Sequence, residues 1–159
     1  MKRILIYIAL LAGAVALRPE SADIGKLRPV QLVSVYREDE WVILETDTED
    51  LGRGLSIHDA IKNLKETTPG VIYLDTADFL LVHRDTQNMI PELTAYLKGK
   101  VRVCIAEGDI PLTDASDYLA AHPPKTRIRD WYPEKQLEIL QHQGERIILR
   151  ISENSENNA

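Results

Sequence analysis

Two aspartates near the middle of the chain have the spacing that most resembles a catalytic motif. Asp75 and Asp78 are separated by a threonine and an alanine, and they follow the apolar run at residues 71–74. Two carboxylates that are held close together share one proton, and such a pair can carry out acid–base catalysis. These residue types therefore allow a small hydrolase that uses Asp75 and Asp78.

The segment D-T-A-D at residues 75–78 resembles the active-site turn of retroviral-type aspartic proteases, where an apolar strand enters D-T-G-A-D. The glycine that brings the two carboxylates together is missing here, and the apolar run at residues 147–149 is followed by Arg150 instead of glycine. Phosphatases that form an aspartyl phosphate need D-x-D, whereas this spacing is D-x-x-D. We therefore predict that the chain is not an enzyme, with the aspartic-protease-like hydrolase as the alternative.

The acidic segment at residues 45–50 is the best candidate for a metal site. Calcium binds several oxygen ligands from one flexible loop, and Asp47, Glu49 and Asp50 are the candidate ligands. The segment lacks the D-x-[DN]-x-[DN]-G spacing and a terminal glutamate. A solvated acidic loop is the favoured interpretation, and we predict no metal or other cofactor.

Aromatic and basic residues near the C-terminus indicate a contact surface. Trp131 and Tyr132 lie beside Arg127 and Arg129, and aromatic residues and arginine are enriched in protein interfaces. These four residues are the candidate interaction site. The alternative is that they cover the edge of the sheet.

Composition excludes one class of partner. The net charge is −6, and nucleic-acid binding requires a basic field, so nucleic acid is not expected as a partner.

The single cysteine, Cys104, lies in an apolar run and cannot form an internal disulfide, so we predict an inert buried thiol.

The first 17 residues have the pattern of a leader. Lys2 and Arg3 precede an apolar stretch at residues 4–17, which as a helix would span ~21 Å, less than the ~30 Å membrane core. Residues 1–17 are therefore predicted to be a signal peptide cleaved after Ala16, or a membrane anchor. Both alternatives place the protein across or on the cytoplasmic membrane, whereas an N-terminal core element would not.

The rest of the chain predicts an α+β fold. Residues 18–28 read as a linker, residues 29–151 as one domain, and residues 152–159 as a polar disordered tail. The expected order is β-β-α-β-(β)-α-β-α with a C-terminal β segment, in which three helices pack on a mixed sheet.

The first predicted helix is the best specified element. Ser56 is its N-cap and Asp59 its capping partner, and an apolar stripe falls at helical spacing. The two apolar runs that follow, at residues 71–74 and 79–82, predict two strands or one bent strand covered on both faces. Helices are then expected at residues 89–97 and 114–121, with a strand at 100–106 between them. Residues 136–151 are expected to form a hairpin, or a short helix and a strand.

A longer pattern begins with G-L-S-I-H-D-A-I-K-N-L at residues 54–64 and continues through the two apolar runs to K-V-R-V-C-I-A-E-G-D at residues 100–109. Over about residues 30–122 it resembles the N-terminal domain of the Ger(x)C family, membrane-attached subunits of spore germinant receptors. In that family, a G-x-[ST]-I-x-E-A-[IL]-x-N-L helix precedes a strand, a second helix and a V-x-V-x-V-A-E-G-D strand.

The resemblance implies a non-enzymatic exported or membrane-tethered module that binds proteins or assembles with them. Its expected partners are other membrane or envelope proteins, and its expected role is linked to sporulation or germination. Family members are typically lipoproteins, but Ala14 stands where the lipid-bearing cysteine would be, so this route of attachment is not expected. The histidine position of the family's strand is taken by Asp75 or Thr76.

Overall fold

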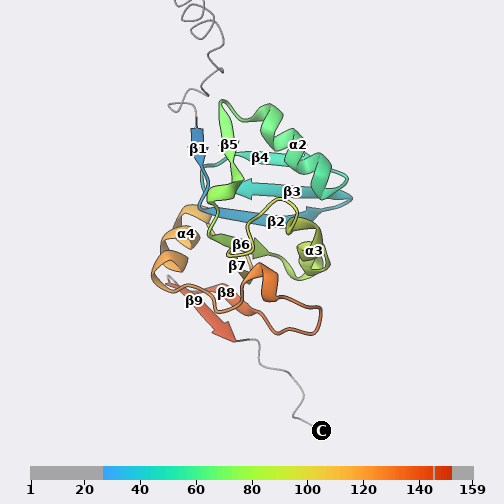
Figure 1. Ribbon diagram of the computed structural model, residues 1–159. Coiled ribbons are helices and arrows are strands. Elements are labelled where there is room, and N and C mark those ends of the chain that lie inside the picture. The colour runs from blue at the N-terminus through green and yellow to red at the C-terminus, as the bar shows by residue number, and fades with distance from the viewer. Residues whose placement is uncertain (1–26, 145, 152–159) are drawn as a thin grey trace, which may run out of the picture.

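The computed structural model describes residues 27–144 and 146–151 (Figure 1). These residues form a seven-stranded sheet, a two-stranded sheet and three α-helices. The strands are β1 (Leu27–Pro29), β2 (Leu32–Glu38), β3 (Trp41–Thr46), β4 (Leu51–Gly54), β5 (Val71–Tyr73), β6 (Phe79–Val82), β7 (Arg102–Glu107), β8 (Glu138–Gln143) and β9 (Arg146–Ile151). The α-helices are α2 (Ile57–Thr67), α3 (Ile90–Leu93) and α4 (Leu112–Ala121), and the 3-10 helices are η2 (Leu74–Thr76), η3 (Arg84–Met89) and η4 (Ile128–Asp130).

The large sheet has the strand order β4-β3-β2-β6-β7-β8-β9. Its central strands β2, β6, β7 and β8 are parallel, whereas β3 and β4 at one end and β9 at the other are antiparallel to their neighbours. Antiparallel neighbours need only a tight turn, while parallel neighbours need a crossover. The predicted α+β class, with a mixed sheet and about three helices, is confirmed.

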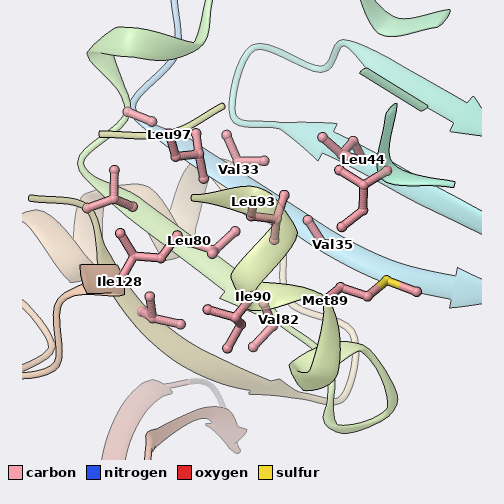
Figure 2. Close-up of a cluster of buried hydrophobic side chains, with 14 of the residues drawn as sticks. Val33, Val35, Leu44, Leu80, Val82, Met89, Ile90, Leu93, Leu97 and Ile128 are labelled. Carbon is pink, nitrogen blue, oxygen red and sulfur yellow. The ribbon is translucent and has the colours of Figure 1, made fainter. Parts of the chain in front are cut away.

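The two faces of the large sheet carry separate apolar clusters. On the first face, Val33 and Leu80 belong to a cluster that includes residues of α2 and α3, and Figure 2 shows strand side chains gathered with Ile90 and Leu93. On the second face, Leu81 belongs to a cluster with residues of α4. Because successive side chains of a strand point to opposite faces, β6 contributes to both clusters and all four of its residues are buried.

The helix α2 forms as its sequence predicts. The Ser56 hydroxyl accepts a hydrogen bond from the Asp59 backbone N–H at 3.1 Å and donates one to the Asp59 carboxylate at 2.7 Å. This satisfies one of the backbone N–H groups that a helix leaves unpaired at its start. The buried stripe is the predicted one, namely Ile57, Ala60, Ile61 and Leu64.

The strand β5 differs from its prediction. The two apolar runs form two strands in different sheets, because η2 separates them and β5 pairs with β1 alone. Val71 is 50% exposed and Tyr73 is 45% exposed. The prediction of cover on both faces is therefore confirmed for β6 and wrong for β5, which lies outside the large sheet.

The later elements follow the predicted order with changed bounds. The helix expected at residues 89–97 is reduced to the single turn α3, which follows the 3-10 helix η3. Pro91 stands in the first turn of α3, where a proline is tolerated. The helix α4 begins earlier than predicted, with Pro111 in place of Thr113 at its N-cap. The hairpin of β8 and β9 is confirmed by their antiparallel register.

Three terminal predictions fall largely outside the described residues: the leader at residues 1–17, the linker at 18–28 and the tail at 152–159. Leu27 and Arg28, the last residues of the predicted linker, are already paired with β5 in β1. In the described ranges, no helix has the length and apolar character that crossing a membrane requires.

Candidate functional site

A pocket of about 270 Å³ opens where the parallel strands β2, β6 and β7 end. We call it the carboxyl-edge pocket. It lies on the second face of the large sheet, next to the start of α4. Its polar groups come from Ser34, Tyr36, Glu45, His83, Gly108 and Asp109.

The topology of the sheet explains why a pocket forms at this place. After β2 the chain turns back into β3 at one side, whereas after β6 it enters η3 and α3 on the first face. After β7 it enters α4 on the second face. Neighbouring strands whose connections leave in different directions create a crevice at their carboxyl ends, where ligands of such sheets commonly bind.

The floor of the pocket contains a serine hydroxyl. Ser34 is only 3% exposed, and its side chain lines the pocket. None of the side-chain hydrogen bonds among the described residues involves this hydroxyl. The hydroxyl can therefore bond to water or to a ligand in the pocket.

Tyr36 is the centre of a negatively charged environment. Burial raises the pKa of Tyr36 above its ordinary value, and the carboxylates of Glu45, Glu38 and Asp109 raise it further. These carboxylates come from β3, from the end of β2 and from the segment after β7. The phenol therefore stays protonated at neutral pH and can donate a hydrogen bond.

The remaining charges near the pocket are arranged around the same strand ends. The His83 ring lies 5.4 Å from the Tyr36 ring, measured between centroids and tilted by 44°. At the end of β7, Glu107 pairs with Arg84 at 3.6 Å. No lysine or arginine is among the residues that line the pocket, so its lining carries negative charge from Glu45 and Asp109.

A second hollow, of about 410 Å³, lies at the opposite ends of the strands, beside Asp78 and Lys100. Three of its four charged side chains already have partners. Lys100 Nζ lies 2.6 Å from the Asp78 carboxylate, and the Arg102 guanidinium donates to the Pro124 carbonyl oxygen at 2.6 Å. The carboxyl-edge pocket is therefore the better candidate for a binding site.

The two candidate catalytic aspartates lie at the amino end of β6, opposite the carboxyl-edge pocket. Each has a different cationic partner: Asp78 pairs with Lys100 at 2.6 Å, and Asp75 lies 3.9 Å from Lys98. All four side chains are about half exposed. Each aspartate therefore faces a lysine of its own, whereas the two carboxylates of an aspartic dyad face each other and share one proton.

Thr76, between these aspartates, is bonded to the rest of the fold through its hydroxyl. Its hydroxyl accepts from the Val30 N–H at 3.0 Å and lies 2.9 Å from the Val30 carbonyl oxygen and 2.7 Å from that of Tyr73. The Asp78 N–H in turn donates to the Gln31 carbonyl oxygen at 2.9 Å. These hydrogen bonds therefore connect the segment at residues 75–78 to the residues that precede β2.

We expect Thr76→Val to lower the free energy of unfolding by about 1–3 kcal/mol, because the substitution leaves the Val30 backbone groups without a partner. Urea denaturation followed by circular dichroism measures the change. Thr113→Val is the matched control, since Thr113 is exposed in the first turn of α4. Equal stability of the two variants would contradict the structural role of Thr76.

The candidate metal ligands are bonded to protein groups. The Asp47 carboxylate accepts from the Gln31 N–H at 3.1 Å, and the Asp50 carboxylate pairs with Arg28 at 2.8 Å. Glu49 is exposed and adopts a positive φ of 63° in the turn. Across residues 27–144 and 146–151, no three or more His, Cys, Asp or Glu side chains are grouped so that they could hold a metal ion.

The candidate interaction residues do not form one exposed patch. Trp131 is half-buried and packs against the first-face cluster, whereas Tyr132 and Arg129 are exposed. Arg127 forms an isolated backbone bridge with β7. Trp131 therefore covers the core, and Tyr132 and Arg129 remain available for contact.

Sequence reasoning did not identify the carboxyl-edge pocket. His83 reads as a strand-end polar residue, Ser34 and Tyr36 lie in an ordinary strand pattern, and Glu45 begins the acidic segment at residues 45–50. One signal could have found the site: polar residues follow two consecutive apolar runs, at His83 and at Gly108-Asp109. The carboxyl ends of neighbouring parallel strands bring such residues together.

Comparison with known proteins adds no assignment: no family model, no curated protein and no solved structure matches the chain.

Proposed function

We propose that this chain is a non-enzymatic binding and assembly module, exported or tethered by residues 1–17, which holds a protein partner at the carboxyl-edge pocket. The observation that carries the proposal is the pocket itself, a concave site of about 270 Å³ where polar groups from β2, β3, β6 and the segment after β7 converge. Convergent polar groups in a pocket at strand carboxyl ends are typical of binding sites.

The surface beside the pocket favours a protein partner. Ser34, Glu45 and Leu51 are register partners across β2, β3 and β4, so they form one row on the second face. Exposure rises along this row, from Ser34 at 3% to Leu51 at 47%. A partner segment could enter the pocket and continue over the open strands.

Next to this row lie the half-buried Trp41 and the exposed Arg53. The Arg53 guanidinium lies 4.6 Å from the centroid of the Trp41 ring. Arginine and tryptophan commonly contribute most of the binding energy of an interface. The pocket and its neighbouring strand face therefore offer both an anchor site and a contact surface.

The cellular part of the proposal is supported by sequence. Residues 1–17 have the pattern of a signal peptide or anchor, and the resemblance to Ger(x)C subunits favours a membrane or envelope partner linked to sporulation or germination. The hydrolase alternative finds less support, since Asp75 and Asp78 pair with different lysines.

The test is site-specific cross-linking in the organism that encodes the chain. A photo-reactive residue at Leu51 should give one discrete adduct in the membrane or envelope fraction, and the same residue at Glu92, exposed on α3, should not. Leu112→Trp, which fills the mouth of the pocket, should reduce the adduct about tenfold or more. An adduct unaffected by Leu112→Trp would overturn the proposed site.

Two further measurements separate the remaining parts of the proposal. An intact Met1 in the soluble cytosol, found by fractionation and N-terminal sequencing, would overturn the proposal that the protein is exported.

The double variant Asp75→Asn, Asp78→Asn should leave the Leu51 adduct unchanged. A hydrolytic activity of the native chain that disappears in this double variant would instead establish the hydrolase.

A further inference from the structure

We propose that the carboxyl-edge pocket recognises an organic cation, the ammonium or guanidinium group at the end of an apolar stem such as a lysine or arginine side chain. This inference rests on the proposed function, because it names the chemistry by which that same pocket would hold its partner.

Charge is the first support. Glu45 and Asp109 line the pocket together with His83, and no lysine or arginine does. The nearest cation described at the strand ends, Arg84, is paired with Glu107 at 3.6 Å. A ligand cation would therefore meet two carboxylates, of which Glu45 also interacts with the Tyr36 hydroxyl, and hydrogen bonds between charged groups are the stronger kind.

Unused polar and aromatic groups are the second support. The Ser34 hydroxyl is nine-tenths buried, lines the pocket and has no side-chain hydrogen bond among the described residues. It can accept a hydrogen bond from an N–H group of the ligand. The Tyr36 ring offers a negatively polarised face to a cation, provided that the ligand lies above it.

The apolar part of the lining is the third support. Leu81, Ala106, Ile110 and Leu112 surround the polar groups, and such walls suit the methylene stem of a long basic side chain. About 270 Å³ lies just below the usual range for drug-sized ligands, which begins near ~300 Å³. One side chain or a small amine therefore fits better than a nucleotide.

An anionic ligand is the main competitor, because the amino terminus of α4 lies beside the pocket. A helix start carries roughly half a positive charge. Asp114 stands in the first turn of α4 and Asp109 precedes the helix, so carboxylates already occupy this positive end. With Glu45 on the facing strand, the balance favours a cation.

The test uses the full chain as purified from its host and follows binding by calorimetry and NMR. N-acetyl-lysine methylamide should bind at least about tenfold more tightly than its neutral analogue, N-acetyl-norleucine methylamide, or N-acetyl-glutamate methylamide. Glu45→Gln and Asp109→Asn should each weaken lysine binding by about tenfold. Asp117→Asn, on the exposed side of α4, is the matched control and should leave it unchanged.

Each other outcome has a defined meaning. If the norleucine or glutamate compound binds as tightly as the lysine compound, or if none binds, the cation inference is overturned, while the cross-linking experiment still judges the proposed function. If n-butylammonium binds but the lysine compound does not, cation recognition stands and the protein-partner proposal is overturned. Binding that survives both carboxylate substitutions would place the cation elsewhere and overturn the inference.

Discussion

Replacing Gly52 with alanine is expected to lower the free energy of unfolding by roughly 3 kcal/mol, at the upper end of the usual range for overpacked positions. A Cβ atom at this position would lie 2.2 Å from the Ala60 carbonyl oxygen and 2.5 Å from the Leu64 Cβ. The first of these atoms belongs to the backbone of α2, so it cannot move unless the helix moves. Gly52 is buried at the contact between β4 and α2.

Gly54, two residues along the same strand, faces the same helix. Its Cβ would lie 2.3 Å from the Ala60 backbone nitrogen. The two glycines together let α2 lie directly on β4, and either substitution would separate the two elements. Gly54→Ala is therefore expected to destabilise the fold in the same way.

Urea denaturation followed by tryptophan fluorescence measures these effects, and Gly99→Ala is the matched control. At Gly99 a Cβ would meet nothing closer than the Arg129 Cβ at 3.4 Å. This distance is an ordinary contact with an exposed side chain, so we expect a change within about 0.5 kcal/mol. If Gly52→Ala is as stable as Gly99→Ala, the close packing of α2 on β4 is wrong.

Leu80→Ala is expected to destabilise the protein by about 2–5 kcal/mol, because it removes a large buried side chain and leaves a cavity. Leu80 is fully buried in β6, where it stands opposite Val33 on one neighbouring strand and Val103 on the other. Figure 2 shows it within the first-face cluster together with Leu93 and Ile128. The rigid neighbouring strands limit how far this site can collapse.

Leu51→Ala is the control for this prediction, since Leu51 is 47% exposed and its truncation should cost less than about 1 kcal/mol. Both variants are compared with the native chain by thermal and urea denaturation. Similar losses at the two positions would mean that β6 is not the centre of the core.

Local structure was largely predictable from the sequence. The N-cap at Ser56 and the stripe of α2 depend on residues within about two turns of each other, so nothing distant is needed to specify them. The burial of β6 follows from four consecutive apolar residues, and that of Cys104 from the apolar run around it; both are confirmed. The α+β class follows from the alternation of such segments.

The partners of these segments were not predictable in the same way. Val71 and Tyr73 belong to an apolar run, as the residues of β6 do, yet they are exposed because β5 pairs with β1 instead of joining the large sheet. Thr76 shows no sequence signal, although its hydroxyl binds the backbone of Val30, 46 residues earlier. Pairing and register depend on packing between distant segments, which a local pattern does not contain.

The sequence by itself determined the most strongly patterned segments, such as α2 and β6, because capping, turn chemistry and apolar spacing act over a few residues. It also placed Asp75 and Asp78 three residues apart, but only the tertiary structure gave each carboxylate its own lysine. Only the tertiary structure brought Ser34, Glu45 and Asp109 to one pocket, because strand order decides which chain segments meet at the edge of a sheet.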